Sequence, residues 1–276
     1  MLVWGEVWLF AIIKTRFRVK TNPVERVLWR IFTTRGIDFE VTDTFGVRTL
    51  ECTVDINAND SYKRALARCD NALRLIAANG IRTVVTAEDF PISELGDIYG
   101  LSPPDIRKLW RRTAGKIALF ISGSSRNPLS VALHANRISS DLDGAVRYLL
   151  PRTRHLAVFC AAQGDAYARR LLKEFGIAVQ TTGNAALTAD VHLFFDPPPE
   201  HLELKDSAVA VNLFPGSHEV LWPYRTVSKI QFRWPDGLPK MEGFSGSMLL
   251  AALSESGLVS YDKLDIENVW FSDGGA

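Results

Sequence analysis

The chain has 276 residues, 47% hydrophobic and 23% charged, which suits a globular protein of one large domain or two smaller ones. A net charge of +1 excludes a global field that would draw the molecule onto nucleic acid or anionic lipid. Three cysteines without a CxxC pair predict no zinc site, no other metal site and no disulfide framework, and they favour a reducing, cytoplasmic setting. No apolar stretch approaches the roughly 20 residues of a membrane span, so we expect no membrane association.

The amino-terminal part reads as β-rich. Alternating side chains predict a strand over 7–20, and Asn22-Pro23 predicts a helix that ends at Gly36. Two alternating halves around Gly46 predict a hairpin over 37–57. An apolar stripe after Ser61 predicts a helix over 61–79.

From residue 82 onward, short apolar strands alternate with helices, which is typical of a parallel sheet. The predicted strands are 82–87, 116–122, 155–161, 177–182, 191–195 and 208–213. The predicted helices are a pair within 92–115, a helical region that ends near residue 150, a helix over 165–175 and another over 246–256. We therefore expect an α/β fold: a Rossmann-like, mostly parallel sheet with helices on both faces, plus a β-rich amino-terminal segment. The expected division is 1–115, with hairpin and helix pair, and 116–276, the Rossmann-like domain with a tryptophan-rich tail.

The strand-turn-helix over 155–175 is the most informative stretch. Its turn resembles the phosphate-binding turn of Rossmann-type NAD(P)-binding domains: Ala162 stands at the first glycine position, Gly164 at the second and Tyr167 at the third. The resemblance implies NADP or NAD as cofactor, and an oxidoreductase. Thr181 and Thr182 end the next strand, where an acidic residue would favour NAD. The alternative is a plain turn in which Asp165 compensates the helix dipole.

Ligands of open parallel sheets bind beyond the carboxyl ends of the strands. Asp196 ends one predicted strand, where it could bind a ribose or substrate hydroxyl or cap a turn. The loop Gly123, Ser124, Ser125 and Arg126 ends another, where hydroxyls and a guanidinium could hold an anion. Its alternative is a polar loop before Pro128. The histidines lack metal-binding spacing, and His192, inside an apolar strand, is expected to be a core residue.

Residues 92–116 also match a helix-turn-helix. Arg107, Lys108, Arg111, Arg112 and Lys116 would contact phosphates from its second helix. A helix pair that covers the sheet would have the same periodicity, so both interpretations stay open.

These patterns lead to three functional hypotheses. The first is binding of a nucleotide or another phosphorylated small molecule, with an NAD(P)-dependent oxidoreductase as its narrower form. The second is a DNA-binding regulator that uses residues 92–116. The third is a non-catalytic Rossmann-like protein that binds a partner or forms a homo-oligomer. No catalytic residue is assigned.

Overall fold

The computed structural model describes residues 10–18, 36–46, 48–57, 60–87, 90, 97–123, 130–160, 162–181, 188–198, 202–215 and 224–272. The chain divides into two compact units. Unit 1 comprises Met1–Asp105 and Trp234–Val259, and unit 2 comprises Ile106–Arg233 and Ser260–Ala276. This differs from the boundary expected between 115 and 116. The helix pair after Pro103-Pro104 packs within unit 2, and part of the expected tail returns to unit 1.

Unit 1 contains a four-stranded sheet in the order β2-β3-β1-β4. β2 and β3 form the predicted antiparallel hairpin, while β1 pairs in parallel with β3 and β4. The strands are β1 (Ala11–Arg18), β2 (Ile37–Thr42), β3 (Thr49–Asn57) and β4 (Val84–Thr86). The helix expected over 22–36 lies outside the described residues.

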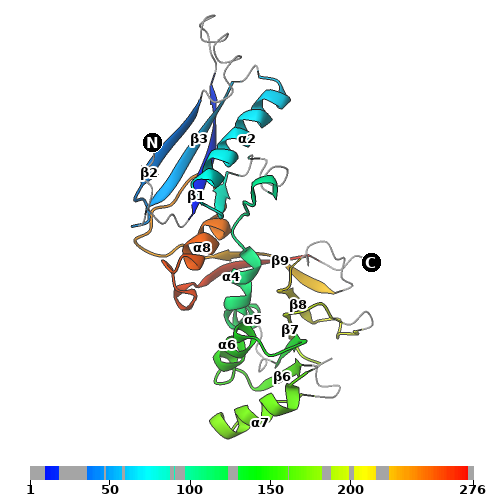
Figure 1. Ribbon diagram of the computed structural model, residues 1–276. Helices are drawn as coiled ribbons and strands as arrows, with labels where there is room; N and C mark the ends of the chain where they lie inside the picture. The colour runs from blue at the N-terminus through cyan, green and yellow to red at the C-terminus, as the bar shows by residue number, and fades with distance from the viewer. Residues whose placement is uncertain are drawn as a thin grey trace, which may run out of the picture. The chain divides into compact units, whose positions relative to one another are not determined.

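Helix α2 (Tyr62–Ala78) packs along one face of this sheet (Figure 1). Its apolar stripe, centred on Leu73 and Ile76, is buried against Leu50, Cys52 and Val54 of β3. The helix ends before Gly80, whose φ of 78° is a left-handed conformation that glycine adopts without strain. Unit 1 also holds the short helix η1 (Asp97–Tyr99) and α8 (Gly246–Glu255), which is the helix predicted over 246–256.

Unit 2 is built on a six-stranded sheet in the order β10-β9-β8-β7-β5-β6. Every neighbouring pair from β6 to β9 is parallel, and β10 runs antiparallel to β9. The strands are β5 (Ser130–Ala135), β6 (His155–Cys160), β7 (Val191–Phe194), β8 (Val209–Asn212), β9 (Arg225–Phe232) and β10 (Ile266–Ser272). Where the sequence predicted a strand over 177–182, Gln180 forms a single parallel bridge to Ala157 on the outer side of β6.

The strand order is that of a Rossmann-like fold. Starting from the Gln180 bridge, it reads third, second, first, fourth, fifth and sixth in the chain order of the unit. The order reverses between β5 and β7. The expected α/β class with a mostly parallel sheet is therefore found, and β5 is the first strand of the fold.

Two predicted elements near this first strand were wrong. Residues 116–122, expected as a strand, belong to helix α5 (Ala114–Ser122), and residues 130–135, expected within a helical region, form β5. The run Ile117 to Ile121 is apolar throughout, and periodicity cannot distinguish a buried helix from a buried strand in so short a run. The first β-α turn of the fold therefore lies between β5 and α6 (Ser140–Leu149). The turn that the sequence pattern singled out, near Gly164 between β6 and α7 (Gly164–Phe175), is the second.

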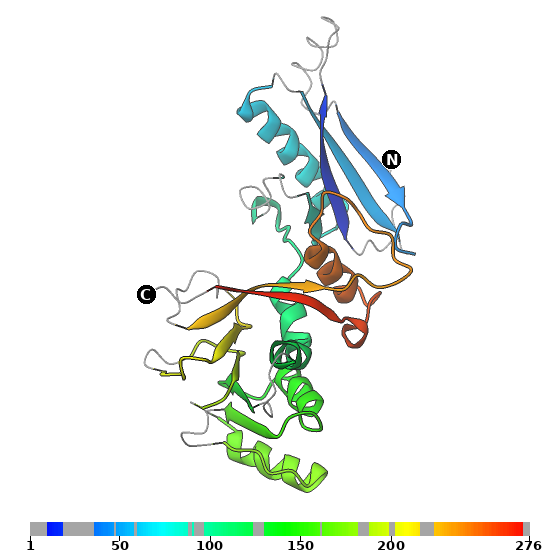
Figure 2. The ribbon, with the colours of Figure 1, turned by 180° about the vertical axis from the view of Figure 1, so that it is seen from behind.

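Helices α4 (Ile106–Arg112), α5 and α6 of unit 2 pack on one another, and α7 packs against β6 (Figures 1 and 2). Among the described residues, the connections from β7 to β8 and from β8 to β9 contain no helix. There the sheet residues Phe194 and Ala210 pack against Leu202, Leu204 and Phe214 of these connections instead. No helix in the described part of the chain is long and apolar enough to cross a membrane.

Candidate functional site at the carboxyl edge of the unit 2 sheet

The residues that follow β5, β6 and β7 are joined by hydrogen bonds that backbone amides donate. The amide of Asn136, just after β5, donates to Asp196 Oδ2, just after β7, at 2.8 Å. The amide of Ala162, after β6, donates to the carbonyl of Asn136 at 3.3 Å. The expected convergence of strand ends is thus found, and it includes the point where the strand order reverses. In open α/β sheets this is where ligands bind.

The predicted residues after β6 lie together. Thr181 donates its hydroxyl proton to Asp165 Oδ1 at 2.7 Å. Gly164 is buried, and a Cβ placed on it would lie 3.7 Å from Thr181 Cβ. The glycine is therefore buried against Thr181, and its contact with a phosphate stays a prediction. Thr182 lies outside the described residues.

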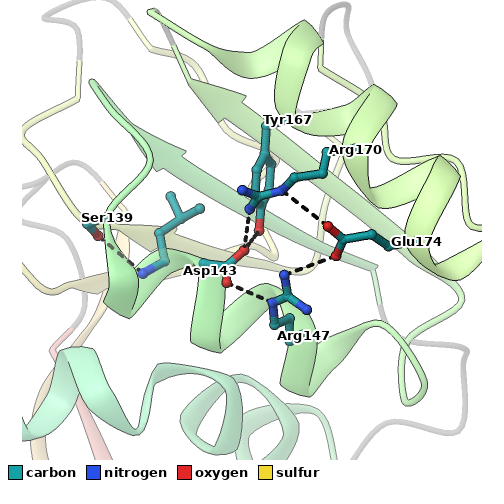
Figure 3. A network of polar contacts seen from close by, with 7 residues as sticks. Ser139, Asp143, Arg147, Tyr167, Arg170 and Glu174 are labelled. Carbon is teal, nitrogen blue, oxygen red and sulfur yellow. Dashed lines mark hydrogen bonds and ion pairs between the residues drawn. The ribbon is translucent and has the colours of Figure 1, made fainter.

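Tyr167, at the third position of the glycine pattern, connects α7 to α6 (Figure 3). Its hydroxyl donates to Asp143 at 2.8 Å, and the same carboxylate accepts from Arg147 at 2.7 Å and Arg170 at 2.9 Å. Arg147 also contacts Glu174 at 3.1 Å. Burial alone would raise the pKa of Asp143, but these hydrogen bonds and cations hold it below its ordinary value. The pKa of Tyr167 is raised by burial and by the hydrogen bond to Asp143. The bulky residue thus has a structural role that a glycine could not fill.

The loop expected to follow a strand at Gly123 has a different setting. Gly123 is the C-terminal cap of α5, and its amide donates to the carbonyls of Leu119 and Phe120. Ser124, Ser125 and Arg126 lie outside the described residues. Because residues 116–122 are helical, the strand-end argument for this loop no longer holds.

The true first turn, Ala135 to Ser140 between β5 and α6, contains no glycine. Arg137 and Ile138 stand where backbone would have to approach a pyrophosphate closely, and the amide of Asn136 is already bound to Asp196. A dinucleotide pyrophosphate cradled by backbone amides therefore does not fit this turn. The sequence missed the turn because β5 was read as part of a helix.

The same turn offers side chains that suit a single phosphate. Arg137 is exposed and its guanidinium has no partner among the described residues. Ser139 caps α6 by accepting from the amide of Leu142 at 3.2 Å, and Ser140 is exposed beside it. A helix N-terminus, two hydroxyls and a free guanidinium form an arrangement that binds oxyanions.

Two carboxylates in the first turn of α6 are compensated by arginines. Asp141 lies 3.3 Å from Arg111 Nε and 2.7 Å from Arg112 Nε, and Asp143 is held by Arg147 and Arg170. Four arginines against two carboxylates keep this end of α6 from repelling an anion.

Four of the five basic residues of α4 and α5 contact other residues of unit 2, namely Arg107, Arg111, Arg112 and Lys116. Arg107 donates to the carbonyl of Asn212 at 2.8 Å, Arg111 and Arg112 contact Asp141, and Lys116 donates to the carbonyls of Asp262 and Leu264 at 2.6 and 2.7 Å. α5 packs against β7 and β10, and α4 against α6. A helix pair that covers a sheet would make such contacts, and DNA binding by residues 92–116 stays a prediction.

Asn212, at the carboxyl end of β8, has a buried side chain whose amide nitrogen and oxygen both lack a hydrogen bond among the described residues. A buried amide without partners is costly. It is a second polar group at this edge of the sheet that a ligand could satisfy.

His192 is a core residue, as expected. Its Nδ1 lies 3.1 Å from Nε2 of His134 on β5, and His134 stacks between Phe159 and Phe194 at 5.3 and 4.6 Å between ring centroids. Burial lowers the pKa of His134 to about 3 and that of His192 to about 4. Both rings are therefore neutral near pH 7.

No family model matches the sequence, and no curated protein matches it. Among solved structures, the chain is similar to quinate dehydrogenase from Corynebacterium glutamicum, with 11% identity, 94% and 95% of the two chains covered and a TM-score of 0.38. It is also similar to a shikimate 5-dehydrogenase-like protein, with 11% identity, 92% of each chain covered and a TM-score of 0.35. A third match is L-tryptophan dehydrogenase from Nostoc punctiforme, with 15% identity and a TM-score of 0.31. It covers 74% of this chain, and the matched part spans 63% of that dehydrogenase.

Proposed function

We propose that unit 2 binds a nucleotide or another phosphorylated small molecule at the carboxyl edge of its sheet, with a phosphate held at the turn between β5 and α6. The observation that carries the proposal is the position of the unpartnered Arg137, with Ser139 and Ser140, where the strand order reverses. At this turn, side chains would bind the phosphate in place of the backbone amides of a glycine-rich turn. One charge-assisted contact of this kind contributes about 1.5 to 3 kcal/mol.

The rest of the ligand would contact the neighbouring strand ends. Asp196 uses Oδ2 for the Asn136 amide, while its Oδ1 has no partner among the described residues and can accept a hydroxyl such as that of a ribose. The amide of Asn212 at the end of β8, which has no hydrogen bond to a described residue, offers N–H donors and an acceptor oxygen. Ala162 follows β6, and Asp165 lies in the first turn of α7.

The narrower hypothesis is an NAD(P)-dependent oxidoreductase. NADP carries a phosphate monoester that Arg137 could hold while the pyrophosphate lies elsewhere, whereas NAD has no such group. We therefore expect NADP to bind more tightly than NAD if this form of the proposal is correct. No residue is assigned to hydride or proton transfer.

A thermal-shift experiment on the full chain tests the proposal with NADP, NAD, adenosine monophosphate and inorganic phosphate. At least one phosphorylated compound should raise the melting temperature, and Arg137→Gln should weaken its binding by about 10-fold or more. Arg169→Gln is the matched control, because Arg169 is an exposed arginine of α7 that has no contact with the turn.

Two results would count against the proposal. If none of the four compounds stabilises the protein, the non-catalytic interaction hypothesis becomes the better one. If Arg137→Gln and Arg169→Gln bind equally well, the phosphate does not lie at the β5-α6 turn.

A further inference from the structure

A cavity of about 240 Å³ lies in unit 2 between the start of α5, one side of α6 and the short helix η4 (Tyr261–Lys263). It is distinct from the β5-α6 turn, although Ser140 lines it. Cavities that hold drug-sized ligands start at about 300 Å³, so this one suits a smaller metabolite. Among the residues that line it are Arg112, Lys116, Ser140, Asp141, Tyr148 and Asp262.

The lining contains two cations and two carboxylates, but their contacts differ. Lys116 is saturated, since its ammonium donates to two backbone carbonyls, at 2.6 and 2.7 Å, and lies 3.7 Å from Asp265. Arg112 contacts Asp141 through Nε alone, and its two terminal nitrogens have no hydrogen bond among the described residues. Arg112 is therefore the cation that can still bind an anionic group.

The two carboxylates keep acceptors for a cationic group. Asp141 Oδ1 is buried and lies 2.7 Å from Arg112 Nε, yet the two groups are not aligned for a hydrogen bond, so this oxygen has none. The carboxylate of Asp262 has no partner within the described part of the chain. A buried carboxylate oxygen without a hydrogen bond is costly, and an ammonium donor would relieve that cost.

We propose that this cavity binds a small zwitterion of the size of a free amino acid. Its carboxylate would pair with the terminal nitrogens of Arg112, and its ammonium would donate to Asp141 Oδ1 and Asp262. The lining carries both signs of charge, so a ligand of only one sign would leave either Arg112 or the two carboxylates without a partner from the ligand. The hydroxyls of Ser140 and Tyr148 make no hydrogen bond to any described residue, so they can bind the remaining polar atoms.

Thermal shift and calorimetry on the full chain, with the common amino acids added one at a time at about 10 mM, test the proposal. At least one amino acid should bind. The matching amine, which lacks the carboxylate, and the matching carboxylic acid, which lacks the ammonium group, should not bind. Arg112→Gln and Asp262→Asn should each weaken binding by about 10-fold or more. Lys263→Gln, which changes an exposed charge in the same short helix, should leave it unchanged.

The proposal fails if no amino acid binds, if the amine or the acid alone binds as well, or if both Arg112→Gln and Asp262→Asn keep full affinity. Circular dichroism of each variant checks that it folds. Because Arg137 does not line the cavity, Arg137→Gln should retain amino-acid binding, so this test stands or falls separately from the phosphate site.

Discussion

Acidification should destabilise unit 2 through the buried pair His134 and His192. In the unfolded chain both imidazoles have a pKa near about 6.5. In the folded protein, burial lowers these values to about 3 and about 4. Between these limits the unfolded chain binds protons that the folded chain does not, so stability is present at neutral pH and is lost as the pH falls below about 6.5.

The magnitude follows from the size of the window. Each pH unit below about 6.5 costs about 1.4 kcal/mol for each histidine that stays neutral in the fold. At pH 5 the two histidines together should therefore cost about 4 kcal/mol. The carboxylates with lowered pKa values, Asp143 and Asp190, contribute stability that is lost only below their ordinary pKa of 3.8, outside this window.

Urea unfolding at pH 7 and pH 5, followed by circular dichroism, measures the loss. His155→Gln is the matched control, since His155 is exposed at the start of β6 and its removal should leave the loss intact. His134→Phe/His192→Phe should remove it, because phenylalanine can stack with Phe159 and Phe194 without titrating. Should that variant not fold, histidine-ring NMR of the native chain gives an independent answer: two rings must stay neutral down to pH 5. A stability difference below about 1 kcal/mol between the two pH values, or rings that titrate near pH 6.5, would refute the reasoning.

Further predictions concern the packing of α6. Gly115→Ala should destabilise the protein by about 1 to 3 kcal/mol, because the new Cβ would lie 2.7 Å from Tyr148 Cδ1; Gly144→Ala, with nothing within 4 Å, should instead be neutral or stabilising by up to about 1 kcal/mol. Urea midpoints compare the two, and equal effects would contradict the close contact of α5 with α6. Tyr167→Phe should cost about 1.5 to 3 kcal/mol because Asp143 loses a donor, whereas Tyr148→Phe, whose hydroxyl has no hydrogen bond among the described residues, should cost under about 1 kcal/mol. A Tyr167→Phe variant with an unchanged midpoint would show that the network of Figure 3 contributes nothing to stability.

The local patterns of this chain were sufficient for many elements. The stripe of Leu73 and Ile76 predicts α2, the alternation around Gly46 predicts the hairpin, and the apolar run before Gly164 predicts β6 and its helix. These predictions succeed because amphipathic periodicity and glycine at helix ends are local properties.

The site depended on features that are not local. Residues 116–122 and 130–135 are both short and mostly apolar, and only packing decided that the first is helix α5 and the second strand β5. That choice decides which turn is the first of the fold. The candidate phosphate site therefore changes from Gly164, which is packed against Thr181, to Arg137, which lies where the strand order reverses. The sequence by itself determined the α/β class and the helices with clear amphipathic stripes, because each depends on neighbours along the chain. Strand order, the partners of Asp141 and the burial of the Asn212 amide were decided by tertiary structure alone, because they depend on residues that lie far apart in the chain and meet only when the sheet assembles.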